Sequence, residues 1–320
     1  MTFPITGLPP YNFHVTVGPS CSPGTSNSAT CVGGNIVNAN FGITASPWLQ
    51  GKGLDLRIDA GFDNSMTQGQ FASLVGSGGT PGIIFSGSSN PEFGAGSASS
   101  TNWKVGNFLY PEIYTPPILN ATKISYAYLL GIAQKNDITP TDIAASCAGG
   151  IANCSLSTTL PHGLYIANGD LTLTSSNYTF PANQDYVILV SESLTIKGEI
   201  HIPVGSTVTF SVSGNIIVDK AVGSPASSTT PNLEGYYSAD RSFLTGGNND
   251  CAIGADLRLN IGGTVVTNAA LLGGSFTNQR DLCADNANFP SFFLTERPDF
   301  ILNAPQFIQT SQAIWQEVAP

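Results

Sequence analysis

The feature that most constrains the fold is a 22-residue repeat with strand-like periodicity in the middle of the chain. Three short segments recur without a gap, namely 178–181 with 200–203, 187–190 with 209–212, and 194–196 with 216–218. A further segment, 171–173, lies 23 residues before Leu194. One such repeat cannot bury its apolar face alone, so neighbouring repeats must stack to complete the core and the backbone hydrogen bonds. The repeat predicts an all-β fold, a right-handed parallel β-helix (β-solenoid). A two-sheet sandwich also alternates strands and turns, but the gap-free register favours the solenoid.

Composition narrows the classes of partner. Only 10% of the 320 residues are charged, and the formal net charge is −10. Such a chain repels phosphate backbones, so nucleic acid is not an expected partner. No apolar run is long enough to span a bilayer, and no membrane insertion is expected from this chain.

The six cysteines form three pairs of sequence neighbours: Cys21 with Cys31, Cys147 with Cys154, and Cys251 with Cys283. An even count in a lysine-poor chain favours disulfides and an extracellular or cell-surface location. Six cysteines allow fifteen connectivities, and the neighbour pairing is our prediction. Because no CxxC occurs and His14, His162 and His201 are scattered, we expect no metal and no cofactor.

The chain divides into a Pro-, Gly- and Ser-rich segment at 1–45 and a solenoid domain at 46–320. The first segment is a cap, a linker or an assembly arm. A helical insertion is expected at about 108–146, with its helix at 124–135, and a C-terminal cap at about 285–320. We expect this cap to protect the unpaired edge of the last repeat.

Two further similarities extend the repeat. Residues 163–168 parallel 235–240, and residues 255–260 echo the alternating strand at 54–59. If the repeat resumes after the loop at 223–231, the inward-facing positions are Leu257, Leu259, Val265, Leu271 and Phe276.

Several phrases occur together in a distinctive order: 46–55, 163–172, 212–216, 232–237, 279–282 and the terminal Trp-Gln-Glu-Val-Ala-Pro at 315–320. In this combination, residues 45–320 resemble a family of uncharacterised exported or surface proteins of candidate-phyla bacteria. The resemblance implies export, a β-rich domain and display at the cell surface. It supplies no catalytic residues.

Two charged strand faces are candidates for ligand binding. Asp55, Arg57 and Asp59 share one face by the strand period of two, and Asp256 and Arg258 form a similar pair. Carboxylates flanking an arginine can hold a cation or act as acid and base at a sugar. The simpler alternative, which we favour, is a solvated strand face with exposed ion pairs.

Other charged segments favour structural roles. Arg280-Asp281 and the segment 296–299 concentrate charge near the expected cap, where arginine–carboxylate pairs hold loops in register. The turn at 248–250 lacks the carboxylates of a dedicated calcium loop. Nucleophile elbows and phosphate-binding loops are absent from the sequence.

The sequence therefore predicts a non-enzymatic, extracellular structural or adhesive surface protein, with self-assembly into a filament or surface array as one form of that role. The alternative is a polysaccharide-binding or polysaccharide-cleaving β-helix. The expected partners are the protein itself or surface glycans.

Overall fold

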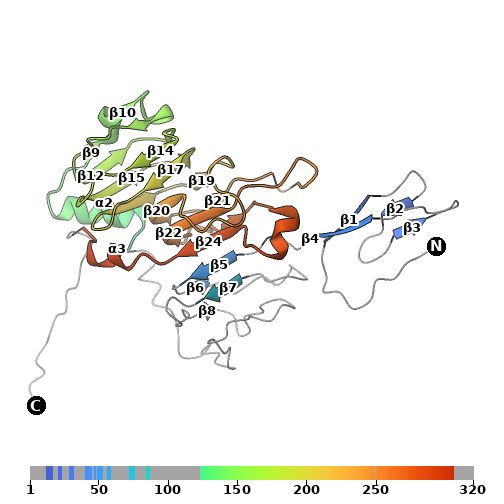
Figure 1. Cartoon of the computed structure of the whole chain (residues 1–320). Coiled ribbons are helices and arrows are strands. Elements are labelled where there is room, and N and C mark those ends of the chain that lie inside the picture. The colour runs from blue at the N-terminus through green and yellow to red at the C-terminus, as the bar shows by residue number, and fades with distance from the viewer. Residues whose placement is uncertain are drawn as a thin grey trace, which may run out of the picture.

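Figure 1 shows the computed structural model, which describes residues 123–248 and 250–305. It also describes residue 47, strand β5 (Leu49–Lys52) and the backbone of seven N-terminal strands: β1 (Asn12–Thr16), β2 (Cys21–Pro23), β3 (Ala29–Cys31), β4 (Asn40–Thr44), β6 (Leu56–Ile58), β7 (Ala72–Val75) and β8 (Ile84–Ser86). The described protein is mostly β, with parallel sheets.

A parallel sheet of 11 strands, here called the large sheet, runs through the molecule. Its main path is β7, β5, β24 (Phe292–Thr295), β22 (Leu259–Val266), β20 (Leu233–Ala239), β18 (Thr207–Val212), β15 (Asp185–Val190), β12 (Gly163–Ala167) and β9 (Thr141–Asp142). Two more strands, β14 (Asn177–Thr179) and β17 (Glu199–His201), pair with each other, and β17 also pairs with β20.

A second parallel sheet of 5 strands, the small sheet, follows the same progression. It contains β13 (Leu171–Leu173), β16 (Leu194–Ile196), β19 (Ile216–Val218), β21 (Phe243–Thr245) and β23 (Phe276–Asn278). Each turn of the chain thus adds a strand to each sheet. Smaller pairings join β6 to β8 in parallel, and join β1 to β4, β2 to β3 and β10 (Cys147–Ala148) to β11 (Ser155–Leu156) in antiparallel.

The observed register confirms the strand alignments predicted from the repeat. Tyr178 lies opposite Ile200, and Leu194 lies opposite both Leu171 and Ile216. The similarity between 163–168 and 235–240 is also structural, because both segments lie at the same level of the large sheet through β15 and β18.

A ladder of polar side chains follows one edge of the small sheet and records how the repeat lengthens. It consists of Asp170, Ser193, Asn215, Ser242 and Ser275. Each of the first four accepts a hydrogen bond from the backbone N–H of the next, at 2.9, 3.3, 3.0 and 3.0 Å. The sequence separations along this ladder are 23, 22, 27 and 33 residues. Later turns therefore carry longer loops, while the sheet register is kept.

The core lies between the two sheets and follows the alternation of strand side chains. In β15, Tyr186, Ile188 and Val190 belong to the main buried cluster. Stacked aromatic rings continue this core along the sheets, with centroid distances of 5.3 Å for Phe210–Tyr237 and 5.9 Å for Phe243–Phe276. The rings fill the interior across successive turns.

Helix α2 (Tyr126–Lys135) covers the outer face of part of the large sheet. Ser125 caps it, and Leu129 and Ala133 pack with Val187 and Leu189 in a second buried cluster. This helix confirms the helix predicted at 124–135, from residue 126 onward. After α2 the chain continues as β9 and the 3-10 helix η1 (Ile143–Ser146), and a second such helix, η2 (Ile151–Asn153), follows β10.

The C-terminal strand β24 is not an unpaired edge. It pairs with β22 on one side and with β5 on the other, and β5 in turn pairs with β7. Figure 1 shows the blue strand β5 beside the orange-red β24. The 3-10 helix η3 (Cys283–Ala287) and helix α3 (Pro298–Leu302) flank β24. The edge that a C-terminal cap was expected to protect is thus covered by N-terminal strands.

The echo between 255–260 and 54–59 is not structural. Leu259 lies opposite Phe292, which lies opposite Leu49, so Leu259 is level with β5 and not with β6. Strand β22 begins only at Leu259, so Leu257 precedes it and is 37% exposed. Leu271 lies in a turn with a positive φ of 58° and is 50% exposed. Leu259 is fully buried, and Val265 and Phe276 pack against the core as expected.

Candidate functional site

Five titratable side chains meet on the outer side of β17 and β20, in a chain with few charges. We call this group the His201 cluster, and it consists of Glu199, His201, Glu234, Arg297 and Asp299. Ile200 points into the core, so Glu199 and His201 on either side of it point outward. Because Ile200 lies opposite Leu233, the register brings Glu234 beside His201.

The imidazole of His201 lies between two carboxylates. Its Nε2 is 3.4 Å from Glu199 Oε2, and its Nδ1 is 3.8 Å from Glu234 Oε2. The side chains of His201 and Glu199 are 27% and 33% exposed. Solvent and ligands can therefore reach a histidine that its neighbours already orient.

Arg297 fixes the other side of the cluster. Its Nε and Nη2 donate to the two carboxylate oxygens of Asp299 at 2.8 and 2.7 Å, and its Nη1 donates to Glu234 Oε1. The guanidinium also lies 4.2 Å from the ring centre of Phe300. The hydrogen bond from Arg297 lowers the pKa of Asp299, and the same bond raises the pKa of Arg297. Such a bidentate, stacked arginine is rigid.

Neighbouring polar groups hold the two glutamates. Glu234 Oε2 accepts from the backbone N–H of Ile202 at 2.8 Å, and Glu199 Oε1 accepts from Asn232 Nδ2 at 2.7 Å. The cluster contains three carboxylates and one guanidinium, so the imidazole lies in a net negative environment. A positioned histidine–carboxylate pair can exchange a proton or hydrogen-bond a hydroxyl-rich ligand.

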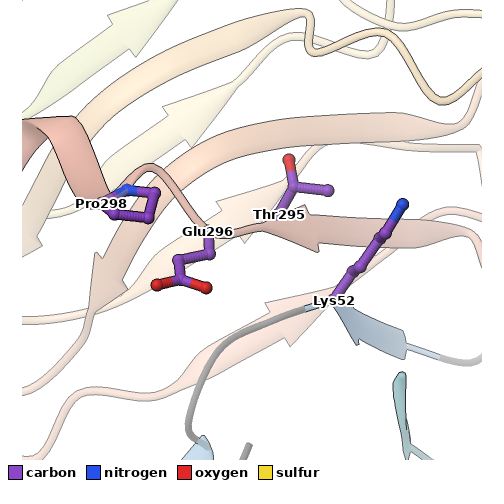
Figure 2. Close-up of a pocket in the computed structure, with 4 residues that line it drawn as sticks. All are labelled: Lys52, Thr295, Glu296 and Pro298. Atoms are coloured by element: carbon purple, nitrogen blue, oxygen red, sulfur yellow. The ribbon is translucent and has the colours of Figure 1, made fainter. Parts of the chain in front are cut away.

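A small hollow of about 240 Å³ lies where β5 meets β24 and α3. Lys52, Thr295, Glu296 and Pro298 line it, and Figure 2 shows the Lys52 and Glu296 side chains extending in different directions. The backbone N–H of Glu296 donates to Lys52 O at 3.0 Å. The hollow is smaller than typical small-molecule sites. It lies at the boundary where the N-terminal strand β5 pairs with the C-terminal strand β24.

The first predicted ligand-binding face falls mostly outside the described residues. Asp55 and Asp59 are not among them, and of Arg57 only the backbone, in β6, is described. Strand β6 pairs with β8 in a separate sheet, whereas Arg258 directly precedes β22 of the large sheet.

The second predicted face is buried, not solvated. Asp256 is 9% exposed and Arg258 is 2% exposed. Asp256 accepts hydrogen bonds from the backbone N–H groups of Asn248 and Asp281. Arg258 donates to Ala226 O at 2.9 Å and lies 4.4 Å from the ring centre of Phe293. Both residues lie beneath loops, because the strand that was expected to expose them begins only afterwards.

Arg280 is the largest fully buried side chain of the described residues. Its two terminal nitrogens donate to Leu257 O at 2.9 Å and to Asp219 O at 3.0 Å. Burial lowers the pKa of Arg280 to about 10. This arginine ties three loop segments together, as expected, but its hydrogen bonds go to backbone carbonyls and not to the predicted carboxylate partner.

Two of the three predicted disulfides are present. Cys147–Cys154 closes the β10–β11 hairpin, and Cys251–Cys283 joins a surface loop to η3. Cys21 and Cys31 lie opposite each other in the β2–β3 ladder, but their sulfur atoms lie outside the described part of the chain. The Asp281 carboxylate lies within 4.8 Å of the sulfur atoms of Cys251 and Cys283, which are bonded to each other.

Sequence reasoning identified the 296–299 segment as charged but missed Glu199, His201 and Glu234. The signal for Glu199 and His201 was the alternation around Ile200. Glu234 occupies the position beside His201 in the next turn. The longer loop before β20 moves it out of the 22-residue spacing, so the repeat alone does not identify it. Arg297 and Glu234 are separated by 63 residues, so only the folded ladder brings them together.

Comparison of the chain with protein-family models, with curated proteins and with solved structures finds no match. None of the helices in the described residues is both long enough and apolar enough to cross a membrane.

Proposed function

We propose that this protein is a right-handed parallel β-helix that works outside the cell as a structural or adhesive surface module and assembles with copies of itself. The observation that carries the proposal is the parallel ladder that joins strands from both halves of the chain into one large sheet. Parallel crossover connections are right-handed in nearly all proteins, which supports the handedness.

The disulfides support a location outside the cytoplasm. Cys147–Cys154 closes a hairpin and Cys251–Cys283 joins a loop to η3, and neither pair forms a CxxC redox motif. Structural disulfides of this kind persist in oxidising compartments. The resemblance to exported surface proteins of candidate-phyla bacteria points the same way.

Stacked turns suit a mechanical or display role. Adjacent strands of such a stack lie ~4.8 Å apart, so loops on successive turns are presented at a fixed spacing. The polar ladder from Asp170 to Ser275 hydrogen-bonds each turn to the next outside the core. A rod cross-linked in this way keeps its surface groups in register.

Negative-stain electron microscopy over a concentration series, with size-exclusion chromatography alongside, tests the proposal. We expect rods or fibres longer than one molecule, and an elution volume that shifts with concentration. A monodisperse monomer at every concentration would overturn self-assembly.

A second candidate function is polysaccharide binding, and the His201 cluster is the observation that favours it. The exposed imidazole and its carboxylates offer donors and acceptors to sugar hydroxyls, and their net negative charge selects neutral or basic glycans. On a glycan array, His201→Ala and Glu199→Gln should each lower binding at least tenfold. The exposed Glu192→Gln is the matched control and should leave binding unchanged. Equal binding by all variants would exclude the cluster as the site.

A further inference from the structure

Strand order in the large sheet differs from chain order at one place, where the N-terminal strands join the C-terminal one. We infer that the segment from β5 to β8 is exchanged between copies, so that β5 of one copy pairs with β24 of a second copy. This inference rests on the proposed self-assembly and names the surface through which it occurs.

The pairing that would be exchanged is already present within one chain. Four residue pairs form the β24–β5 ladder: Phe292–Leu49, Phe293–Gln50, Leu294–Gly51 and Thr295–Lys52. A second copy offers the same ladder with the same contacts, as in other domain-swapped proteins. Without a partner, β24, which carries the buried Phe292, would present an open parallel edge. Such edges recruit strands from other chains.

The chain between β8 and residue 123 is long enough for β5 to pair with β24 of its own copy or of another copy. Strand β8 ends at Ser86, and Ile124, just after the segment, accepts hydrogen bonds at its backbone carbonyl from Ser211 of β18 and Ser238 of β20. The distance from β7 to β18 across the large sheet is ~25 Å at ~4.8 Å per strand. The 87–122 segment, fully extended, can reach on the order of 100 Å. It is therefore long enough to leave one molecule and enter the next.

The opposite end of the stack is blocked. There β9 contributes only Thr141 and Asp142, and the Cys147–Cys154 hairpin lies against the edge of β13. The backbone N–H of Cys154 donates to Thr172 O at 2.8 Å, and Cys154 O accepts from Thr174 N–H at 2.9 Å. Simple end-to-end stacking of intact molecules is disfavoured at this end. Strand exchange needs only the pairing of β5 with β24, at the other end of the stack.

The exchanged contact is heterologous, because the edge of β5 meets the edge of β24 and neither edge meets itself. A heterologous contact that does not close into a ring propagates into an open filament. Because the contacts within and between chains are alike, concentration decides between them, with the crossover near the effective concentration of the linked segment.

Trans cross-linking with single-cysteine variants tests the inference. Lys52 is exposed and Thr295 is half-buried, and they are register partners in adjacent strands. Such Cα atoms lie close enough for a disulfide. Lys52→Cys and Thr295→Cys, each carried by a different copy, are co-expressed and oxidised. We expect a disulfide-linked dimer on non-reducing gels.

The matched control uses Thr172→Cys and Thr195→Cys, also register partners but within one continuous stack. Its dimer yield should be at least tenfold lower than that of the test pair. If the test pair yields no more dimer than the control, strand exchange is wrong.

The electron-microscopy assay separates this result from the wider proposal. Fibres without the Lys52–Thr295 cross-link would retain self-assembly and overturn strand exchange as its mechanism. Monomers without the cross-link would overturn both.

Discussion

Asp240 and Asp299 show how surroundings give the same side chain opposite effects on stability. Asp240, which is 3% exposed, accepts a hydrogen bond from the backbone N–H of Tyr126 at 3.2 Å. Burial raises its pKa. Asp299 is held by Arg297, which lowers its pKa. At neutral pH one carboxylate costs stability and the other contributes it.

The Asp240→Asn substitution should raise the melting temperature at pH 7. The amide keeps an acceptor for the Tyr126 N–H and removes a buried charge. A carboxyl group whose folded pKa is raised costs stability above that pKa, and the cost disappears below its unfolded pKa. The gain should therefore shrink as pH falls toward ~4. Calorimetry at several pH values measures it, and a lower melting temperature at pH 7 would contradict the prediction.

The Asp299→Asn substitution should act in the opposite direction, with a loss of roughly 1 kcal/mol at pH 7. Since its folded pKa is depressed, Asp299 contributes stability above its unfolded pKa, and this contribution is lost as pH falls through the folded pKa. Wild type and variant should converge in acid. Urea unfolding at pH 7 and at about pH 2, below the depressed folded pKa, tests this, with Glu192→Gln as the control. A difference that persists in acid would mean that the Arg297 pair is not its origin.

Some loops between strands pass very close to buried side chains, and Gly223 lies in the clearest example. A Cβ atom added there would lie 2.7 Å from Arg280 Nη1, 2.7 Å from Leu257 Cβ and 2.8 Å from Arg258 O. Only glycine leaves room for the buried Arg280 to bridge its loops.

Gly223→Ala should therefore cost ~1–3 kcal/mol, because the loop or Arg280 must move. Gly131→Ala is the contrasting control, since a Cβ atom on this residue of α2 meets nothing within 4 Å. Alanine is the better helix former, so Gly131→Ala should stabilise by ~0.5–1 kcal/mol. Chemical denaturation of both variants measures the difference in sign. Equal effects would show that the loop around Gly223 relaxes freely.

At the scale of elements, the sequence correctly predicted those strands that recur at nearly equal spacing along the chain. The strands from Leu171 to Val218 paired as predicted, because turns of nearly equal length keep homologous side chains in one register. Beyond Val218 the turns lengthen to 27 and 33 residues, and Leu257 and Leu271 were misplaced. Glu234 escaped notice for the same reason, and with it most of the His201 cluster. The pairing of β5 with β24 leaves no periodic signal at all, because the partners are not successive turns.

At the scale of the molecule, the two disulfides restrain very different lengths of chain. Cys147–Cys154 spans 7 residues of sequence, and Cys251–Cys283 spans 32. The first closes a hairpin at the β9 end of the sheets. The second joins the loop before β22 to η3 before β24.

Replacing Cys251 and Cys283 with serine should lower the free energy of unfolding by about 1.3 kcal/mol more than the same change at Cys147 and Cys154. The cause is the entropy of the unfolded chain, which a longer closed loop restricts more. Guanidinium titrations of the two double variants provide the comparison. A larger loss from the shorter loop would show that native packing at the hairpin, and not chain entropy, sets the effect.

The union of β5 with β24 also imposes a waiting time during synthesis. Translation proceeds at ~5–20 residues per second, so β5 is made on the order of tens of seconds before the strand it must pair with. Throughout that interval the N-terminal strands lack their native partner, and such long-range contacts form late in folding. When several ribosomes translate one messenger RNA, the leading chain completes its β24 before a following chain has made its own β24. The order of translation alone would then favour exchange between neighbouring nascent chains.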